Sequence, residues 1–165
     1  MIVGLVSDSH GKSKRLQAAM EIFARRNVDA VVHCGDIASA GDVEILASIG
    51  CATYLVLGNM DRRIAGLVKA AERWSVHFHP DAVEVPLGEG EYLVATHGSD
   101  SPMLRDLMGD PQFPYVCHGH SHATRDERIG ITRVINPGAL HHVHPRTVAI
   151  LDTESDKLEF IEVED

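Results

Sequence analysis

Short apolar runs alternate with polar, glycine-containing segments in the first third of the chain. Residues 2–6 (IVGLV), 30–34 (AVVHC) and 53–57 (TYLVL) are such runs, and each is followed by a turn-forming segment. This pattern is typical of buried strands. The polar residues that follow each run are therefore expected at the C-terminal end of a strand.

Helical periodicity separates these predicted strands. Between the first two, apolar residues recur at three- and four-residue intervals, which predicts a helix over residues 14–26 with Ser13 as its N-cap. Asp42 is predicted to cap a second helix that leads to Gly50, and a third helix is expected near residues 62–74. The first half is thus predicted to have the order βαβαβα.

The second half of the chain is richer in strand patterns. Apolar alternation between Gly, Pro and Asp turns predicts strands at VHF (76–78), AVEV (82–85), YLVAT (92–96), YVCH (115–118), ITRVI (131–135), TVAIL (147–151) and LEFIEV (158–163). One short helix is expected near residues 103–108. This order indicates an α/β protein with mixed sheets, which can pack face to face with helices outside.

Composition favours one globular domain. The chain has 165 residues, of which 44% are hydrophobic, so residues 1–165 can build a single core without disulfides. No apolar run reaches the roughly 20 residues of a membrane helix, and the N-terminal segment lacks the features of a signal peptide. Cys34, Cys51 and Cys117 have no CxxC spacing. We expect a cytoplasmic protein with buried free thiols and no membrane contact.

Charge excludes one class of partner. The chain carries 24 acidic and 15 basic residues, a formal net charge of −9, so it is poorly suited to binding long nucleic acid. Its 11 histidines are the unusual feature, because many stand beside Gly, Asp or Asn in loop-like segments. Any chemistry is expected in these segments.

Side chains that bind metal ions follow five of the predicted strands. They are Asp8 and His10, then Asp36, Asn59, His97, and the pair His120 and His122. Loops after the carboxyl ends of strands converge on one crevice in open α/β sheets. Taken singly, each residue is better explained as a helix cap, a turn residue or a satisfied polar group. The ordered set of five loops reverses that preference and predicts a metal site.

The ordered segments DSH, GD, GN, THG and GHSH resemble the calcineurin-like metallophosphoesterase superfamily, and NPGA at 136–139 resembles a segment of one branch. The chain is most similar to the small bacterial and archaeal phosphodiesterases. The resemblance implies a four-layer α-β-β-α sandwich of two mixed β-sheets flanked by helices. It also implies two ion sites that share Asp36, one held by Asp8, His10, Asp36 and His122 and the other by Asp36, Asn59, His97 and His120.

This ligand set predicts hydrolytic chemistry. Nitrogen and oxygen donors without thiolate suit manganese, our first choice, as well as nickel, iron, zinc or cobalt. Two divalent ions and two carboxylates leave a net charge of about +2, which holds an anionic phosphate. We expect a phosphodiesterase that cleaves small phosphodiesters or nucleotide-like substrates by attack of a metal-bridging hydroxide. Asp36, Asn59 and His97 are its predicted catalytic residues.

Two positions depart from the family pattern. Many relatives carry His directly after the GN pair, where it is thought to protonate the leaving oxygen, but this chain has Met60. General acid catalysis is typically worth about a hundredfold to ten-thousandfold, so its loss favours diesters over demanding monoesters. Ser99 replaces a second His that many relatives carry, and Asp61 is expected to hydrogen-bond its own loop or cap a helix.

Several other residues have two interpretations. One of His141, His142 and His144 is a candidate replacement acid, although a solvated loop is the preferred interpretation. Arg146 is a candidate phosphate ligand, but an exposed position before a strand is preferred. His118 is expected to support the ligands, His33 to lie in the core, and His77 and His79 to be ordinary strand residues.

Two alternative functions stay open. The first is a phosphomonoesterase or nucleotide phosphatase. The second is a non-catalytic metal-binding scaffold that resembles the retromer subunit of the superfamily, against which the retained ligand set argues. Because small relatives often self-associate, a homodimer is also expected.

Overall fold

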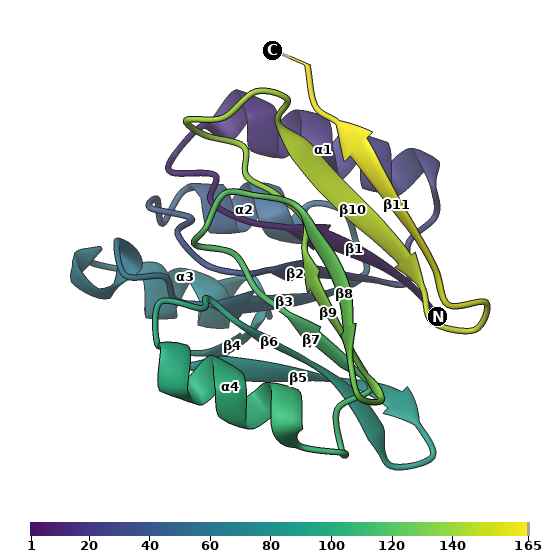
Figure 1. Ribbon diagram of the computed structural model, residues 1–165. Helices are drawn as coiled ribbons and strands as arrows, with labels where there is room; N and C mark the ends of the chain where they lie inside the picture. Colours follow the sequence, from purple (N-terminus) through teal and green to yellow (C-terminus); the bar gives the residue numbers. More distant parts are fainter. Residues whose placement is uncertain (165) are drawn as a thin grey trace.

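Two β-sheets lie face to face between helices in the computed structural model, which describes residues 1–164 (Figure 1). The strand order is β11-β10-β1-β2-β3-β4 in the first sheet and β5-β6-β7-β9-β8 in the second. Helices α1 (Ser13–Arg25), α2 (Asp42–Ala47) and α3 (Leu67–Arg73) lie outside the first sheet, and α4 (Ser101–Gly109) lies outside the second. The four-layer α-β-β-α sandwich is therefore confirmed.

Both sheets are mixed. In the first, β1 to β4 are parallel to one another, and β10 pairs antiparallel with both β1 and β11. Its strands are β1 (Ile2–Val6), β2 (Ala30–His33), β3 (Ala52–Val56), β4 (His77–His79), β10 (Thr147–Asp152) and β11 (Lys157–Glu162). In the second, β6, β7 and β9 are parallel. Its strands are β5 (Ala82–Gly88), β6 (Glu91–Thr96), β7 (Tyr115–Cys117), β8 (Arg125–Ile129) and β9 (Thr132–Asn136).

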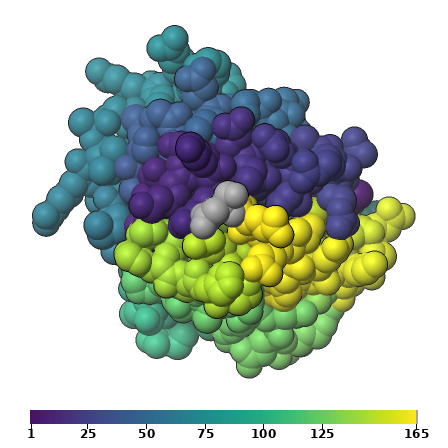
Figure 2. Space-filling view, turned by 90° about the horizontal axis from the view of Figure 1, so that it is seen from above, coloured from purple at the N-terminus to yellow at the C-terminus, as the bar shows by residue number. Residues whose placement is uncertain are grey.

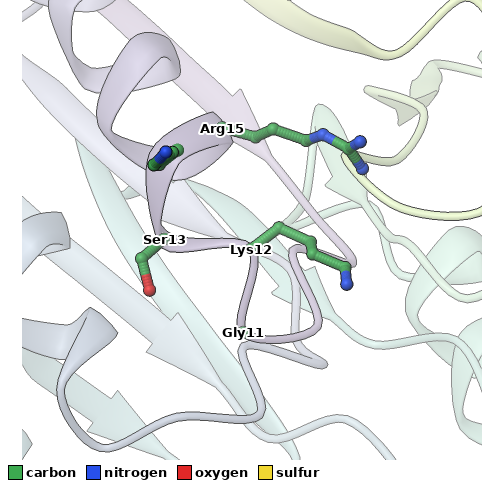
Figure 3. A pocket seen from close by; sticks show the side chains of 5 residues that line it. Gly11, Lys12, Ser13 and Arg15 are labelled. Atoms are coloured by element: carbon green, nitrogen blue, oxygen red, sulfur yellow. The ribbon is translucent and has the colours of Figure 1, made fainter. Parts of the chain in front are cut away.

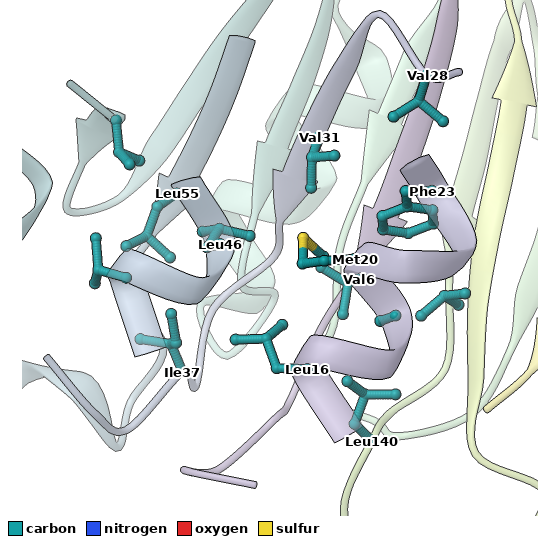
Figure 4. Packing of buried hydrophobic residues seen from close by; sticks show 14 of the residues in the cluster. Val6, Leu16, Met20, Phe23, Val28, Val31, Ile37, Leu46, Leu55 and Leu140 are labelled. Carbon is teal, nitrogen blue, oxygen red and sulfur yellow. The ribbon is translucent and has the colours of Figure 1, made fainter. Parts of the chain in front are cut away.

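Buried strands with apolar residues on both faces create this layering. Val3 and Leu5 of β1 belong to the cluster between the sheets, together with Leu93 and Ala95 of β6. Alternate residues face the helices instead, where side chains of α1 such as Phe23 pack on the first sheet (Figure 4). A smaller cluster packs α4 against the second sheet. The central strands are thus buried on both faces, which explains their continuous apolar runs.

The two predicted helix caps are wrong. Ser13 is the first residue of α1, and its hydroxyl donates to Asp42 Oδ1 at 2.6 Å instead of accepting from its own helix. Asp42 is likewise the first residue of α2, after Gly41, and α2 ends at Ala47, before Gly50. The two side chains join the N-termini of neighbouring helices. Such a pairing depends on tertiary structure and is invisible to local capping rules.

Two further elements differ from the prediction. The helix expected near residues 62–74 is a 3₁₀ turn at Asp61–Arg63 followed by α3, because Gly66 between them has a φ of 86°, which no helix accommodates. Strand β8 was not predicted, because its residues RDERI are mostly exposed and lack apolar alternation. Within the described residues, no helix is long and apolar enough to cross a membrane.

Candidate metal centre

All five predicted ligand loops meet at the carboxyl ends of the parallel strands. Three backbone hydrogen bonds join the loop after β1 to the loop after β2: the N–H groups of Asp8, His10 and Gly11 donate to the carbonyls of Gly35 at 3.0 Å, Asp36 at 2.9 Å and Ile37 at 2.9 Å. In the second sheet, the N–H of Gly119 donates to His97 O at 3.0 Å. The backbone itself therefore aligns the loops.

Asp8 is fully buried and presents one oxygen to two histidines. Its Oδ2 accepts hydrogen bonds from the Ser7 hydroxyl at 2.6 Å and the N–H of His120 at 3.0 Å. Its Oδ1 lies 3.2 Å from His122 Nε2 and 3.8 Å from His10 Nε2. Among residues 1–164, neither Asp8 Oδ1 nor His10 Nε2 has a hydrogen-bond partner. Buried polar atoms without partners are costly, and a cation between these atoms would satisfy them.

Asp36 stands between the two halves of the site. Its Oδ1 accepts a hydrogen bond from the N–H of Met60 at 2.8 Å. Its Oδ2 lies 3.7 Å from His10 Nε2 and 3.4 Å from His97 Nε2. One oxygen is thus fixed by the backbone, which leaves the other to face both imidazoles.

The tautomer of His97 follows from its neighbours. His97 Nδ1 lies 2.9 Å from Cys34 O, and because a carbonyl only accepts, Nδ1 carries the proton. The lone pair of neutral Nε2 then faces Asn59 Oδ1 at 3.0 Å and Asp36 Oδ2 at 3.4 Å. The ring of His120 is also close, with its centroid 5.1 Å from that of His97. Such convergence of electron-rich atoms requires a proton or a metal ion between them.

The ionisation of these groups is consistent with this need. Burial lowers the pKa of His97, but its contacts with Asp36 and Cys34 O outweigh burial, so the pKa is raised from its usual value. Burial raises the pKa of Asp36, but His97 and the N–H of Met60 outweigh it, so this pKa is lowered. Both shifts favour a protonated His97 imidazole beside an ionised Asp36 carboxylate. A divalent ion can supply the same charge in place of the proton.

The backbone at the ligands is strained. Asp8, His10, Asp36, His120 and His122 all have positive φ, from 46° to 66°. Residues other than glycine rarely adopt this region, and such outliers concentrate at functional sites. Five of the seven predicted ligands have this conformation in the loops that follow the strands, which points to a functional site independently of side-chain type.

Two glycines leave the space that the carboxylates occupy. A Cβ on Gly58 would lie 2.0 Å from Asp36 Oδ1, and a Cβ on Gly119 would lie 1.9 Å from Ser7 Oγ and 2.6 Å from Asp8 Oδ2. No larger residue fits at either position without moving a predicted ligand. The GN and HGHSH segments thus need glycine because the loops approach each other closely.

The donor set fits divalent metal ions. Within residues 1–164, Asp8, His10 and His122 form one group whose ligand atoms lie within 4.8 Å of one another, and Asp8, Asp36 and His97 form a second. Carboxylate, imidazole and amide donors without thiolate suit first-row transition metals. The structure brings together all seven predicted ligand residues.

Residues around the ligands have supporting contacts. Asp61 is buried and accepts hydrogen bonds from the N–H groups of Ala38 at 2.7 Å, Gly58 at 2.8 Å and Ile37 at 3.2 Å. The predicted loop-bonding role of Asp61 is therefore confirmed, and its carboxylate ties the loop after β2 to the loop after β3. His33 is fully buried, as predicted, with its Nε2 3.0 Å from Ser9 Oγ.

Three histidines outside the ligand set have different surroundings. His118 is buried, with Nδ1 3.1 Å from Gly119 O, next to the ligand loop that it was expected to support. His77 and His79 lie in β4, as predicted. His141 lies at the edge of the centre, its ring centroid 5.0 Å from that of His10. The acid role proposed for the loop at 141–144 stays a prediction.

Sequence reasoning missed two groups of residues. Ser7 holds Asp8, and Asn136 Nδ2 donates to Gly119 O at 2.9 Å and to Ser121 Oγ at 3.0 Å, so it fixes the HGHSH loop. Nothing in local sequence identifies such long-range contacts. The second group comprises Lys12 and Arg15, which line a hollow with the histidines at 141–144.

Comparison with known proteins assigns the chain to a superfamily of phosphoester hydrolases. The sequence profile of the calcineurin-like phosphoesterase superfamily domain matches residues 1–156, and the chain belongs to this superfamily. Members use divalent metals, and the carboxylate and imidazole groups described above can bind them. The family assignment confirms the resemblance drawn from the sequence motifs.

Relatives extend over nearly the whole chain. A phosphodiesterase of Methanocaldococcus jannaschii is 28% identical over 170 residues, covering 99% of this chain and 98% of the relative. The probable metallophosphoesterase YsnB of Bacillus subtilis is 29% identical over 168 residues, covering 94% and 86%. A solved structure described as a novel archaeal phosphodiesterase superposes with a TM-score of 0.88 at 26% identity, covering 99% and 100%. The relatives support phosphoester hydrolysis by this chain.

Proposed function

We propose that the protein is a metal-dependent phosphodiesterase that hydrolyses small phosphodiesters at a dinuclear centre. The observation that carries this proposal is the position of Asp36 Oδ2, 3.7 Å from His10 Nε2 and 3.4 Å from His97 Nε2. A carboxylate oxygen that faces ligands from both halves of a site is suited to bridging two ions. Similarity to the M. jannaschii phosphodiesterase supports the choice of diesters.

The ligands divide into two sets that share Asp36. Asp8, His10, Asp36 and His122 are assigned to one ion, and Asp36, Asn59, His97 and His120 to the other. Manganese is the preferred metal, and nickel, iron, zinc and cobalt suit the same donors. When bound, the two ions supply Lewis acidity and activated water for in-line attack on phosphorus.

The protein's own residues set the charge and geometry of the centre. Asn59 contributes an oxygen without a negative charge, so the site stays attractive to an anionic phosphate. Cys34 O keeps the proton of His97 on Nδ1, which leaves Nε2 as the donor. The Ser7 hydroxyl and the N–H of His120 hold Asp8 in place by donating hydrogen bonds to its Oδ2. These contacts preorganise the ligands before any ion binds.

Met60 directs the proposal toward diesters. Its side chain is 54% exposed, and its contact with the centre is the backbone hydrogen bond to Asp36. A thioether carries no transferable proton, so leaving groups that depart without general acid catalysis are favoured. We expect a higher kcat/KM for bis-p-nitrophenyl phosphate than for p-nitrophenyl phosphate on one preparation. The reverse order would favour a phosphomonoesterase.

The test of the proposal is hydrolysis of bis-p-nitrophenyl phosphate by protein loaded with manganese or nickel. Asp36→Asn removes the bridging charge and should lower kcat/KM by at least about a thousandfold. Asp106→Asn is the matched control, because Asp106 is an exposed carboxylate on α4, and it should leave turnover unchanged. If neither metal supports turnover, and iron, zinc and cobalt also fail, the proposal is overturned.

Three broader proposals accompany this function. We propose that residues 1–165 form one metallophosphoesterase domain, supported by the profile match over 1–156 and by the core that the two sheets share. A cytoplasmic location is supported by the free thiols of Cys34, Cys51 and Cys117. A homodimer is a proposal that light scattering can test.

A further inference from the structure

A basic hollow adjoins the candidate metal centre. It has a volume of about 500 Å³ and is lined by Lys12, Arg15, His141, His142, Val143, His144 and Arg146. Three of these residues are cations and three are imidazoles, and none of the lining residues described is acidic. Although the chain has a net charge of −9, Lys12, Arg15 and Arg146 thus lie together around this hollow.

The hollow borders the ligands of the centre. The ring of His141, which lines the hollow, is 5.0 Å from the ring of His10. His10 Nε2 in turn lies 3.7 Å from Asp36 Oδ2. One imidazole, that of His141, therefore lies between the proposed metal site and the hollow.

Two segments far apart in the sequence build the walls. Arg15 Nη1 donates to Leu140 O at 3.0 Å, and the N–H of Leu140 donates to Ser7 O at 3.4 Å, which fixes the segment after β9 against the start of α1. Figure 2 shows the purple N-terminal segment and the yellow-green segment side by side on one face. Arg146 directly precedes β10, as expected, but it is half-buried instead of exposed and lines the hollow.

Lys12 and Arg15 also line a second hollow. It has a volume of about 530 Å³ and lies along Gly11–Arg15, where Lys14 adds a further cation. Figure 3 shows that Lys12 and Arg15 extend to the same side, whereas Ser13 points away from them. The positive charge therefore continues from the edge of the metal centre along the start of α1.

We propose that this basic hollow is a subsite for a second phosphate group of the substrate. The inference rests on the proposed function and names its substrate class: phosphodiesters that carry another phosphate near the scissile one. Lysine and arginine pair with phosphate oxygens, and imidazole N–H groups can donate to them. Its volume lies in the range of about 300–1,000 Å³ that is usual for small-ligand pockets.

Paired substrates test the subsite. The p-nitrophenyl ester of thymidine 5′-phosphate offers one phosphate, and the same compound with a 3′-phosphate offers a second. Wild-type protein loaded with manganese should prefer the bisphosphate by about tenfold in kcat/KM. The preference should shrink between about 0.05 and about 0.5 M salt, because exposed charges are screened. Equal kcat/KM for the two substrates would overturn the subsite.

Removing charge from the hollow should abolish only this preference. Lys12→Gln combined with Arg146→Gln should bring the two kcat/KM values within about twofold, while turnover of the simple ester is retained. Lys69→Gln combined with Arg105→Gln removes the same charge from exposed positions on α3 and α4 and should keep the preference. Equal losses on both substrates would contradict a role in binding the second phosphate.

A binding measurement separates this inference from the proposed function. Calorimetry should show that thymidine 3′,5′-bisphosphate binds wild-type protein about tenfold more tightly than thymidine 5′-phosphate, and that the double variant of Lys12 and Arg146 loses this difference. Failure of hydrolysis with retained selective binding would overturn the enzyme and leave the subsite. Hydrolysis without selective binding would overturn the subsite and leave the enzyme.

Discussion

Each ligand carboxylate in this protein has one oxygen fixed by hydrogen bonds and one left to face imidazoles. Ser7 and His120 fix Asp8, and Met60 fixes Asp36. The identity of the ligands could be predicted from sequence, because metal-binding types follow successive strands. The fixing contacts could not, because Asp8 and His120 are 112 residues apart and only the fold brings them together.

Buried His33 makes the free energy of unfolding depend on pH. Gly35 N–H donates to Nδ1 at 3.2 Å, so neutral His33 carries its proton on Nε2, beside Ser9 Oγ. Burial, with His97, lowers the pKa of His33 from 6.5 to about 3. The unfolded chain therefore binds a proton that the folded chain excludes between these values, and the free energy of unfolding falls as pH falls through this window.

His33→Gln should reduce this acid sensitivity, because glutamine can keep both hydrogen bonds but does not titrate. The wild-type free energy of unfolding should fall more steeply than that of the variant below about pH 6.5, by at most about 1.4 kcal/mol per pH unit. Urea unfolding of both proteins with a chelator present measures the difference at several pH values. Parallel curves would show that His33 does not exclude the proton.

At the scale of elements, hydrogen bonds join the loops that follow the strands to one another. Asp61 bonds three backbone N–H groups across two loops, and the loops after β1 and β2 are paired by backbone bonds. The strands were predictable because their apolar runs are strong. Local patterns gave wrong caps for α1 and α2, because Ser13 bonds Asp42 of the neighbouring helix. They also missed β8, whose exposed residues carry no burial signal.

Gly119→Ala should damage the metal centre through its loop. The added Cβ would meet Ser7 Oγ at 1.9 Å and Asp8 Oδ2 at 2.6 Å, so the loop or the carboxylate must move. We expect kcat/KM for bis-p-nitrophenyl phosphate to fall by about a hundredfold, with about 1–3 kcal/mol lost from the free energy of unfolding. Steady-state kinetics and urea unfolding measure the two effects.

Gly109→Ala is the control for this loop. Gly109 ends α4, and a Cβ there meets nothing within 4 Å. It should keep full turnover and unfold at the same or a slightly higher urea concentration, because alanine favours helix. Wild-type kinetics in the Gly119 variant would show that the close packing of this loop does not position Asp8.

At the scale of the whole molecule, the two sheets bring ligands from both halves of the chain to one edge. Asp8, His10, Asp36 and Asn59 follow strands of the first sheet, and His97, His120 and His122 follow strands of the second. Periodicity alone indicated mixed sheets but not their division, because buried strands with apolar faces on both sides fit several layer orders. The four-layer order came from the family resemblance.

A metal titration of activity tests whether the protein hydrolyses diesters at a dinuclear centre. Metal-free protein is titrated with manganese while turnover of bis-p-nitrophenyl phosphate is followed. Turnover should rise to a plateau at about two ions per chain, since Asp36 joins two ligand sets. Full turnover without added metal, or a plateau at one ion per chain, would contradict a dinuclear centre.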